Sequence, residues 1–360
     1  MQNKGLLFIP DISGFTRFVT ESEIDHSRLI IQELLEILIN ANNLDLTISE
    51  IEGDAILFYK FGEPPSLEEL YKQVEKMFVE FHRNIHAYQQ RRYCQCKACI
   101  SVADLTLKVI THYGEFTGYN VKSFNKLIGR DIIVAHQLLK NDIPLHEYWL
   151  VTNNLIQDKK PADLTTWMQW EQSAKQTETG EIPFQYTQLG QLKNAITPEP
   201  PVQPDFDKMV KIFSTEKEYD TDIITLFHAT GDFKYRYRWQ HGVQAVEELN
   251  HYLPRVGMKC RCITDEGEVI ICSNGFDYQE TKIRFNETDE LKKTGTLFTL
   301  ERTGHKKTKL TLDFYMRANP LAQVMFNLTR KRKMEEGFKK SMERLVGLVK
   351  ELKIPTAALS

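Results

Sequence analysis

A proline-rich segment near the middle of the chain limits the folds that the whole sequence can adopt. Residues 197–204 read TPEPPVQP, with four prolines among eight residues. Proline fixes the backbone φ angle and lacks an amide hydrogen, so this segment favours an extended conformation and excludes a helix or a central strand. A chain of 360 residues is also longer than one ordinary hydrophobic core supports. The sequence therefore predicts two domains, 1–196 and 205–360, joined by a linker over 197–204.

The charge balance argues against a nucleic-acid partner, and the apolar content argues against a membrane-spanning helix. Residues 1–197 hold 19 basic and 25 acidic residues, and residues 198–360 hold 27 and 24. A nucleic-acid-binding domain usually carries a strong basic surplus, so we expect no nucleic-acid partner. No stretch approaches the roughly 18 apolar residues that a membrane-spanning helix needs. We therefore expect a cytoplasmic protein.

The two halves differ in their patterns of apolar residues. The first half predicts strands over 6–12, 46–52, 55–61, 105–116 and 147–152, and helices over 25–42, 66–91 and 130–139. Ser66 and Glu69 have the spacing of a capping box at the start of the second helix. The second half predicts short antiparallel strands followed by one long amphipathic helix over 321–352. The fold class is thus α+β, with an α/β sandwich followed by an antiparallel sheet that grips a long C-terminal helix.

Two aspartates in turns are the strongest candidates for a functional site. Asp11 ends an apolar strand in FIPDISGFT, and Asp54 lies 43 residues later in the turn of EIEGDA. Backbone amides in glycine-containing turns bind phosphates, and paired carboxylates bind magnesium. If both carboxylates converge, they define a metal-phosphate site; the alternative is that both are structural turn residues.

These motifs, together with THYGE at 111–115, LIG at 127–129 and YTQLGQLK at 186–193, resemble the class III adenylate/guanylate cyclase homology domain in order and spacing. The first half resembles a degenerate form of this domain and is similar to the DUF2652 family. The resemblance covers nearly the whole first half and implies a ferredoxin-like cyclase sandwich. It also implies a purine nucleoside triphosphate as partner, magnesium or manganese as cofactor, and a homodimer that forms through this domain.

The resemblance assigns roles to individual residues of the two motifs. It implies that Asp11, Asp54 and the carbonyl group of Ile12 contact the metal. The amides of Ser13, Gly14, Phe15 and Thr16 would hold the triphosphate. The position that selects the base is Glu50, which is typical of guanylate-type members because a carboxylate accepts two hydrogen bonds from guanine. The second selecting position is Lys126, which fits neither subtype, so GTP is only weakly favoured over ATP.

The helix after Gly129 departs from the family at the positions that matter for catalysis. Active relatives carry an asparagine and, four residues later, an arginine, which stabilise the charge on the transferring phosphoryl group. This chain has Ile133 and Gln137 there. Loss of one such arginine typically costs on the order of a thousandfold or more in rate. We name no confident catalytic residue; Arg130 and Lys140 are possible substitutes for the missing cation.

Three cysteines precede one of the predicted strands. Cys94, Cys96 and Cys99 lie within six residues, a density that binds zinc when a fourth ligand is near. The spacing is not that of paired CxxC motifs. The alternative is a group of reduced, buried or half-buried thiols, so zinc is a possible but not an expected cofactor.

The second half resembles the START/polyketide cyclase (SRPBCC) superfamily in its pattern of strands and its final long helix. Such domains usually hold an apolar or amphipathic ligand between sheet and helix, which implies an apolar small molecule or a lipid as partner. Five aromatic residues are candidate cavity walls, with a filled core as the alternative: Phe227, Trp239, Phe298, Phe314 and Phe338. The basic run over 330–333 could meet an anionic membrane surface or the acidic first domain, or it could be a solvated helix face.

Three hypotheses for function follow. The first is a nucleotide-binding pseudocyclase with a signalling role, coupled to a START-like module that binds a hydrophobic ligand. The second is an active guanylate-type or adenylate-type cyclase that the START-like domain regulates. The third is a non-catalytic interaction scaffold. The sequence names neither the ligand of the second domain nor a downstream partner.

Overall fold

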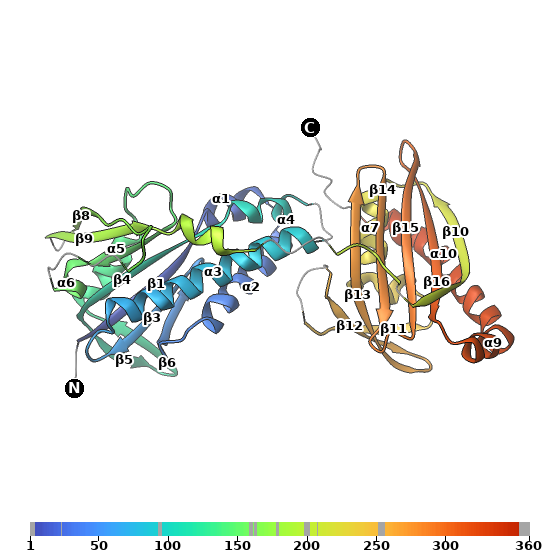
Figure 1. Cartoon of the computed structure of the whole chain (residues 1–360), viewed down its shortest axis with the longest axis horizontal. Coiled ribbons are helices and arrows are strands. Elements are labelled where there is room, and N and C mark those ends of the chain that lie inside the picture. The colour runs from blue at the N-terminus through green and yellow to red at the C-terminus, as the bar shows by residue number, and fades with distance from the viewer. Residues whose placement is uncertain are drawn as a thin grey trace. The chain divides into compact units, whose positions relative to one another are not determined.

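The chain forms two compact units (Figure 1). The computed structural model describes residues 4–22, 24–92, 96–157, 161, 164–177, 180–197, 202–206, 208–250 and 256–352. The first unit comprises Met1–Ala87 and Ser101–Pro198, and the second comprises Tyr88–Ile100 and Glu199–Ser360. The change of unit after Pro198 falls inside the proline-rich segment. The grouping of Tyr88–Ile100 with the second unit was not expected from the sequence.

A seven-stranded sheet forms the centre of the first unit. Its strands are, in order across the sheet, β2 (Thr47–Glu52), β3 (Ala55–Phe61), β1 (Lys4–Ser13), β4 (Thr106–Glu115), β7 (Tyr148–Thr152), β9 (Gly180–Gln188) and β8 (Glu171–Thr177). Neighbouring strands are antiparallel except β4 and β7, which are parallel. A separate hairpin, β5 (Thr117–Val121) and β6 (Phe124–Ile128), follows β4. The sequence predicted β1 to β4 and β7 but missed the hairpin, β8 and β9.

Helices cover the first sheet on both faces. They are α1 (Phe15–Glu21), α2 (Ile24–Asn40), α3 (Leu67–Arg91), α5 (Arg130–Leu138) and the short α6 (Asn153–Ile156). Leu7 and Ile9 of β1 pack in one cluster with Ile132 of α5. Leu6 and Phe8 are also fully buried, and they point to the opposite face, over which α2 and α3 run (Figure 1). Burial on both faces explains the continuous apolar run of β1.

The predicted capping box at the start of α3 is confirmed. The Ser66 amide donates to the Glu69 carboxylate at 2.8 Å, and the Glu69 amide donates to Ser66 Oγ at 3.3 Å. Each side chain thus satisfies a backbone donor of the first turn.

A seven-stranded antiparallel sheet forms the centre of the second unit, as predicted. Its strands are, in order, β10 (Met209–Tyr219), β16 (Lys307–Arg317), β15 (Thr294–Gly304), β14 (Lys282–Asp289), β13 (Gly267–Gln279), β12 (Lys259–Thr264) and β11 (Val243–Glu248). Together with the mixed sheet of the first unit, it confirms the α+β class.

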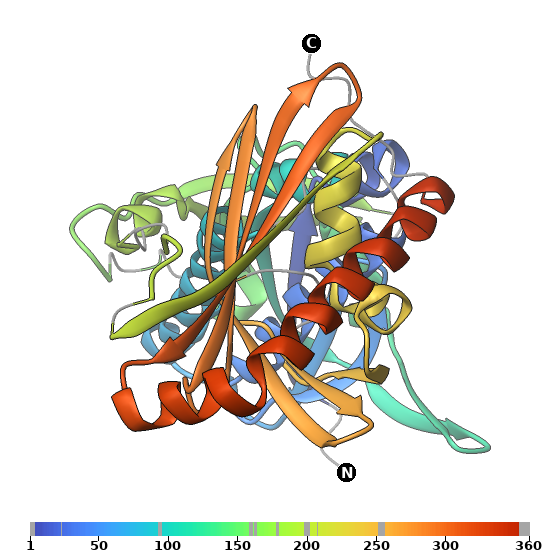
Figure 2. The same ribbon diagram turned by 90° about the vertical axis from the view of Figure 1, so that its right-hand side faces the viewer.

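The long C-terminal helix is present, but its predicted first third is a separate helix. The structure has α9 (Pro320–Thr329) and α10 (Lys331–Glu351), with Arg330 in a non-helical conformation between them. α10 crosses the strands of the second sheet (Figure 2). Two further helices, α7 (Ile223–Gly231) and α8 (Arg236–Trp239), lie in this unit. Within the described residues, no helix combines the length and apolar character needed to cross a bilayer.

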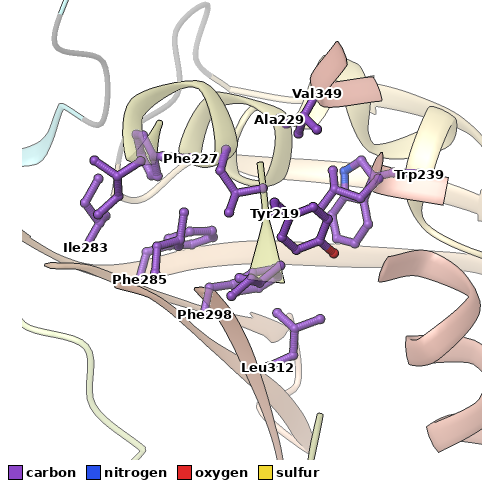
Figure 3. Packing of buried hydrophobic residues seen from close by; sticks show 14 of the residues in the cluster. Tyr219, Phe227, Ala229, Trp239, Ile283, Phe285, Phe298, Leu312 and Val349 are labelled. Carbon is purple, nitrogen blue, oxygen red and sulfur yellow. The ribbon is translucent and has the colours of Figure 1, made fainter. Parts of the chain in front are cut away.

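The five aromatic residues predicted as cavity walls pack against other side chains of the second unit. Phe227, Trp239 and Phe298 belong to one buried cluster that includes residues of α10 (Figure 3). The Phe298 ring stacks on Phe285 with centroids 4.3 Å apart. Phe314 belongs to a second cluster, against which the partly buried Phe338 packs. These contacts favour the alternative of a filled core, and the apolar ligand stays a prediction.

A buried ion pair joins α8 to β14 inside the second unit. Arg236 is 2% exposed and Glu287 is 4% exposed. The guanidinium group donates two hydrogen bonds to the carboxylate, at 2.7 and 2.5 Å. Its central carbon lies 4.6 Å from the centre of the Phe233 ring. Two hydrogen bonds between the same groups fix the orientation and the distance of the guanidinium group relative to the carboxylate, so the pair holds α8 on the sheet.

Candidate metal and nucleotide site

The strand register of the first sheet brings the two predicted carboxylates to one place. Asp11 of β1 pairs with Ala55 of β3, and Asp54 immediately precedes Ala55 in the turn after β2. The Ile12 amide donates to the Asp54 carbonyl oxygen at 3.0 Å, which fixes this turn against β1. Gly53 has a φ of 60°, a conformation that glycine adopts without strain. Asp11 and Asp54 therefore lie at the same end of the central strands.

Burial makes the negative charges of these two side chains unfavourable. Asp11 is only 8% exposed. Burial and the charge of Asp11 together raise the pKa of Asp54 to about 6. Burial also raises the pKa of Asp11, although the neighbouring Lys108 opposes this shift. A divalent cation would relieve the repulsion and stabilise both carboxylates in their charged form.

Lys108 of β4 is a third charged group at this point, and the sequence analysis missed it. It pairs with Asp11 in the β1–β4 register. Its Nζ atom lies 3.3 Å from Asp11 Oδ1 and donates to the Leu139 carbonyl oxygen at 3.1 Å. The sequence feature that could have identified Lys108 is a lysine within the apolar pattern of a central strand. Finding it required knowing that β4 is one of the two strands that lie beside β1.

A cleft of about 830 Å³ opens over the carboxylate pair. Its lining includes both aspartates, Lys108 and the turn over residues 13–16. Residues of α5 and of the segment that follows it also line the cleft, including His136, Gln137, Lys140 and His146. Volumes of this order accommodate a small organic ligand. The cleft thus combines the acidic side chains of Asp11 and Asp54 with the basic side chains of Lys108 and Lys140.

The turn after β1 supplies polar groups to the cleft. Gly14 has a φ of 89°, and a Cβ atom there would lie 3.3 Å from the Asp104 carbonyl oxygen, so the turn favours glycine. The Ser13 hydroxyl is buried and has no hydrogen-bond partner among the described residues. An unsatisfied buried hydroxyl beside two carboxylates fits a site for a hard cation or a phosphate oxygen. The metal and phosphate contacts of Asp11, Asp54, Ile12 and the 13–16 amides remain predictions.

The two positions predicted to select the base bind each other. Lys126 of β6 forms an ion pair with Glu50 of β2, whose side chain is 18% exposed. His136 Nε2 lies 3.6 Å from the other carboxylate oxygen of Glu50. His136 also lines the cleft, so Glu50 lies at its edge. A guanine base that used Glu50 would have to share it with Lys126.

The two predicted departures from the class III cyclase pattern, Ile133 and Gln137, line the same cleft. Ile133 is 53% exposed and lies on its wall with Gln137. The Gln137 Oε1 atom is buried without a hydrogen-bond partner in the described part of the chain. Of the two possible substitutes, Lys140 lines the cleft, whereas Arg130 does not belong to its lining.

A buried polar network fixes the start of α5 against β4. His112 Nδ1 lies 2.8 Å from Thr152 Oγ1, and its Nε2 lies 2.9 Å from Asp131 Oδ1. The Glu115 amide donates to Asp131 Oδ2 at 2.6 Å. Burial alone would raise the pKa of Asp131, but the hydrogen bonds from His112 and Glu115 lower it. A Cβ atom at Gly114 would lie 2.2 Å from the Asp131 carboxyl carbon, so only glycine leaves room for this contact.

The predicted cysteine cluster is only partly described. Cys94 lies outside the described residues. Cys96 is 5% exposed and Cys99 is fully buried. The Tyr88 hydroxyl donates to Cys99 Sγ at 2.9 Å. These observations agree with buried thiols, and zinc binding stays a prediction.

The fold and the cleft define a two-unit α+β protein whose first unit carries one buried and one half-buried carboxylate at the end of its central sheet. The model of a family described as a protein of unknown function (DUF2652) matches residues 31–148. An uncharacterized protein of Mycobacterium tuberculosis is 28% identical over 134 residues, which cover 35% of this chain and 58% of that relative. The match thus spans less than two thirds of the relative's length.

Several solved nucleotidyl cyclases are similar to the chain at low identity. A bacterial light-regulated adenylyl cyclase is 14% identical, with a TM-score of 0.37, over 54% of this chain and 98% of its own. The catalytic core of a rhodopsin-guanylyl cyclase in complex with ATPαS is 11% identical, with a TM-score of 0.37, over 52% and 96%. The adenylyl cyclase CyaB from P. aeruginosa is 14% identical, with a TM-score of 0.31, over 51% and 93%.

Proposed function

We propose that the first unit binds a purine nucleoside triphosphate together with magnesium or manganese, and that it acts as a signalling pseudocyclase. The observation that supports this most is that the buried Asp11 and the half-buried Asp54 both line the cleft, close enough for the charge of Asp11 to raise the pKa of Asp54. Both side chains would hold the metal, with a possible third contact from the Ile12 carbonyl group. The turn over 13–16 would hold the phosphates. A bound metal would neutralise the phosphate charge.

Slow or absent catalysis is the second part of the proposal. Ile133 and Gln137 line the cleft where a cation is needed to stabilise a transferring phosphoryl group. An apolar side chain and a neutral amide supply no such charge. An active cyclase is the second candidate function, and it is supported by Lys140, which lines the same cleft.

Titration of the purified chain tests the proposal. GTP and ATP are titrated calorimetrically with magnesium, manganese or EDTA, and the reaction mixtures are separated by chromatography. We expect metal-dependent binding, with GTP at least equal to ATP, and no cyclic product above the background of a D54A control. Absence of binding to either nucleotide would leave the scaffold hypothesis. Cyclic product well above the control would instead support the active enzyme.

The affinity for manganese is expected to depend on pH. Asp54, with a pKa of about 6, must lose its proton before it binds a cation. Affinity should therefore be nearly constant above pH 7 and fall as pH drops through 6, by about tenfold at pH 5. Electron paramagnetic resonance of free manganese measures this at pH 7.5, 6 and 5. A wild-type profile that is flat over this range would contradict the assignment of Asp54.

Placing asparagine at position 133 and arginine at position 137 tests whether their absence limits catalysis. The double variant I133N/Q137R is expected to form cyclic nucleotide faster than wild type, on the order of a thousandfold where the new arginine reaches the phosphoryl group. The same pair in a D54N background should form none, because the metal site is lost. Product formation that stays at the wild-type level in the folded double variant would mean that the two substitutions are not what limits catalysis.

The second unit is proposed to bind an apolar small molecule or lipid and to influence the first. The antiparallel sheet of this unit and the helix α10 that packs on it support the proposal. Native mass spectrometry of the purified chain tests it through co-purified ligand. A proposed homodimer of the first unit is tested in the same spectra, with and without nucleotide.

A further inference from the structure

One face of α9 consists of large apolar side chains that are exposed to solvent. Leu321 and Leu328 are each 82% exposed, Met325 is 68% exposed and Val324 is 57% exposed. At 100° per residue, these four positions fall within an arc of about 100° on the helix. Scattered exposed apolar residues are ordinary, but a contiguous set on one helix face marks an interaction surface.

This apolar face belongs to a well-anchored helix. The Asn319 side chain accepts a hydrogen bond from the Ala322 amide at 3.2 Å, and Pro320 occupies the first turn. Phe326, on another side of the helix, is buried and packs on Phe314 with ring centroids 5.7 Å apart. Contacts through Phe326 thus hold α9 in place while its apolar face points away from them.

The neighbouring helix shows that such exposure is not general in this unit. The apolar residues Met342, Leu345 and Leu348 of α10 are all buried in the core against the sheet. α9 lies at one end of the same sheet (Figure 1). The break at Arg330 therefore separates a helix that completes the core from one that presents its apolar face outward.

The apolar face is flanked by positive charge. Residues 317–334 contain five basic and no acidic residues. The side chains of Arg332 and Lys333 are 94% and 80% exposed. They form ion pairs with Glu336 at 3.1 Å and Glu266 at 2.5 Å, and exposed pairs of this kind are weak and readily exchanged.

From this combination we infer that α9 docks the protein on an anionic membrane surface, with Leu321, Val324, Met325 and Leu328 entering the acyl boundary. Aliphatic side chains on a convex helix face with cations beside it are the features of interfacial helices. Each basic residue near the surface adds attraction to anionic lipids. A helix of ten residues is about 15 Å long, so it would lie in the interface and not span the bilayer. A flat protein partner would not require the basic flank.

Vesicle sedimentation of the full chain tests the inference. We compare vesicles of phosphatidylcholine alone with vesicles that contain about three parts in ten of phosphatidylserine, a strongly anionic composition. The chain should bind the anionic vesicles, and the double variant L321N/L328N should bind at least about tenfold more weakly because two leucines no longer enter the acyl region. The variant R332E/K333E should bind weakly and lose its dependence on salt.

L291N is the matched control, because Leu291 is 65% exposed on the same unit outside α9. It should bind as wild type does, and circular dichroism should show all variants folded. Equal binding of L321N/L328N and wild type would overturn the inference, as would equal binding of wild type to neutral and anionic vesicles. A concentration-dependent dimer in light scattering that L321N/L328N abolishes, without vesicle binding, would assign the face to a second copy of the chain instead.

Discussion

Replacing Asp54 by asparagine is expected to lower the affinity for metal-bound nucleotide by at least about a hundredfold while making the first unit more stable at pH 8. The amide keeps the size of the side chain but removes one of the two charges that would hold the metal. In the folded protein the pKa of Asp54 is raised to about 6 from an ordinary value of 3.8. Its ionised form therefore destabilises the fold at any pH above 6.

The effect of D54N on the free energy of unfolding is expected to depend on pH. The D54N variant should gain on the order of 1 kcal/mol at pH 8, since solvent screens part of the pKa shift. The gain should shrink as pH falls through 6 and vanish below about pH 4, where the carboxyl group is protonated in both states. Thermal unfolding at pH 8, 6 and 4 measures it, alongside calorimetric nucleotide titration.

E52Q is the matched control for D54N. Glu52 lines the same cleft, but its side chain is 62% exposed. The same loss of one charge should leave stability nearly unchanged and reduce nucleotide binding only slightly. If D54N and E52Q behaved alike in both measurements, burial of the Asp54 carboxylate would not be the property that matters, and the metal site would need another location.

Replacing Arg236 by methionine is expected to destabilise the second unit by roughly 3–5 kcal/mol, because the substitution leaves Glu287 charged and buried without a partner. Glu287 is 4% exposed and accepts both of its short hydrogen bonds from this guanidinium group. Replacing both residues, as in R236M/E287L, should recover most of the loss, since no uncompensated charge remains. Urea unfolding measures the loss of stability. Hydrogen exchange of peptides from β14 reports on the second unit separately from the first.

K259M is the matched control for the replacement of Arg236 by methionine. Lys259 pairs with Glu290 at 3.0 Å, but both side chains are more than 40% exposed. Loss of an exposed pair costs less than about 1 kcal/mol. Comparable losses in R236M and K259M would show that burial of the Arg236 pair contributes nothing, and a double variant no more stable than R236M would show that packing, not charge, causes the loss.

Most of the fold followed from local patterns in the sequence. The apolar run that became β1 and the capping box of α3 each fix a structure through neighbours in the chain. β8 was missed because its residues are largely exposed and polar, so no alternation marked it. The break at Arg330 was missed because apolar spacing continues through α9, although none of the described residues of the unit buries that face.

The site was predictable only where the groups sit in short motifs. Asp11 and Asp54 stood out because each ends a strand in a glycine-containing turn. Lys108 and His136 depend on which strands and helices become neighbours, and no local pattern encodes that. The ion pair between Glu50 and Lys126 joins residues 76 positions apart, so two separate predictions about base selection turn out to concern one contact.

The contact between Lys108 and Asp11 bears on how the chain would respond to its ionic surroundings. An ammonium group tethered 3.3 Å from one carboxylate is present at a fixed local concentration, whatever the composition of the medium. A divalent ion would have to compete with that group, so half-loading of the proposed site would need more free metal than it would without the lysine. Shortening or neutralising the lysine would lower that concentration, so this residue would tune the affinity of the proposed site for its cation.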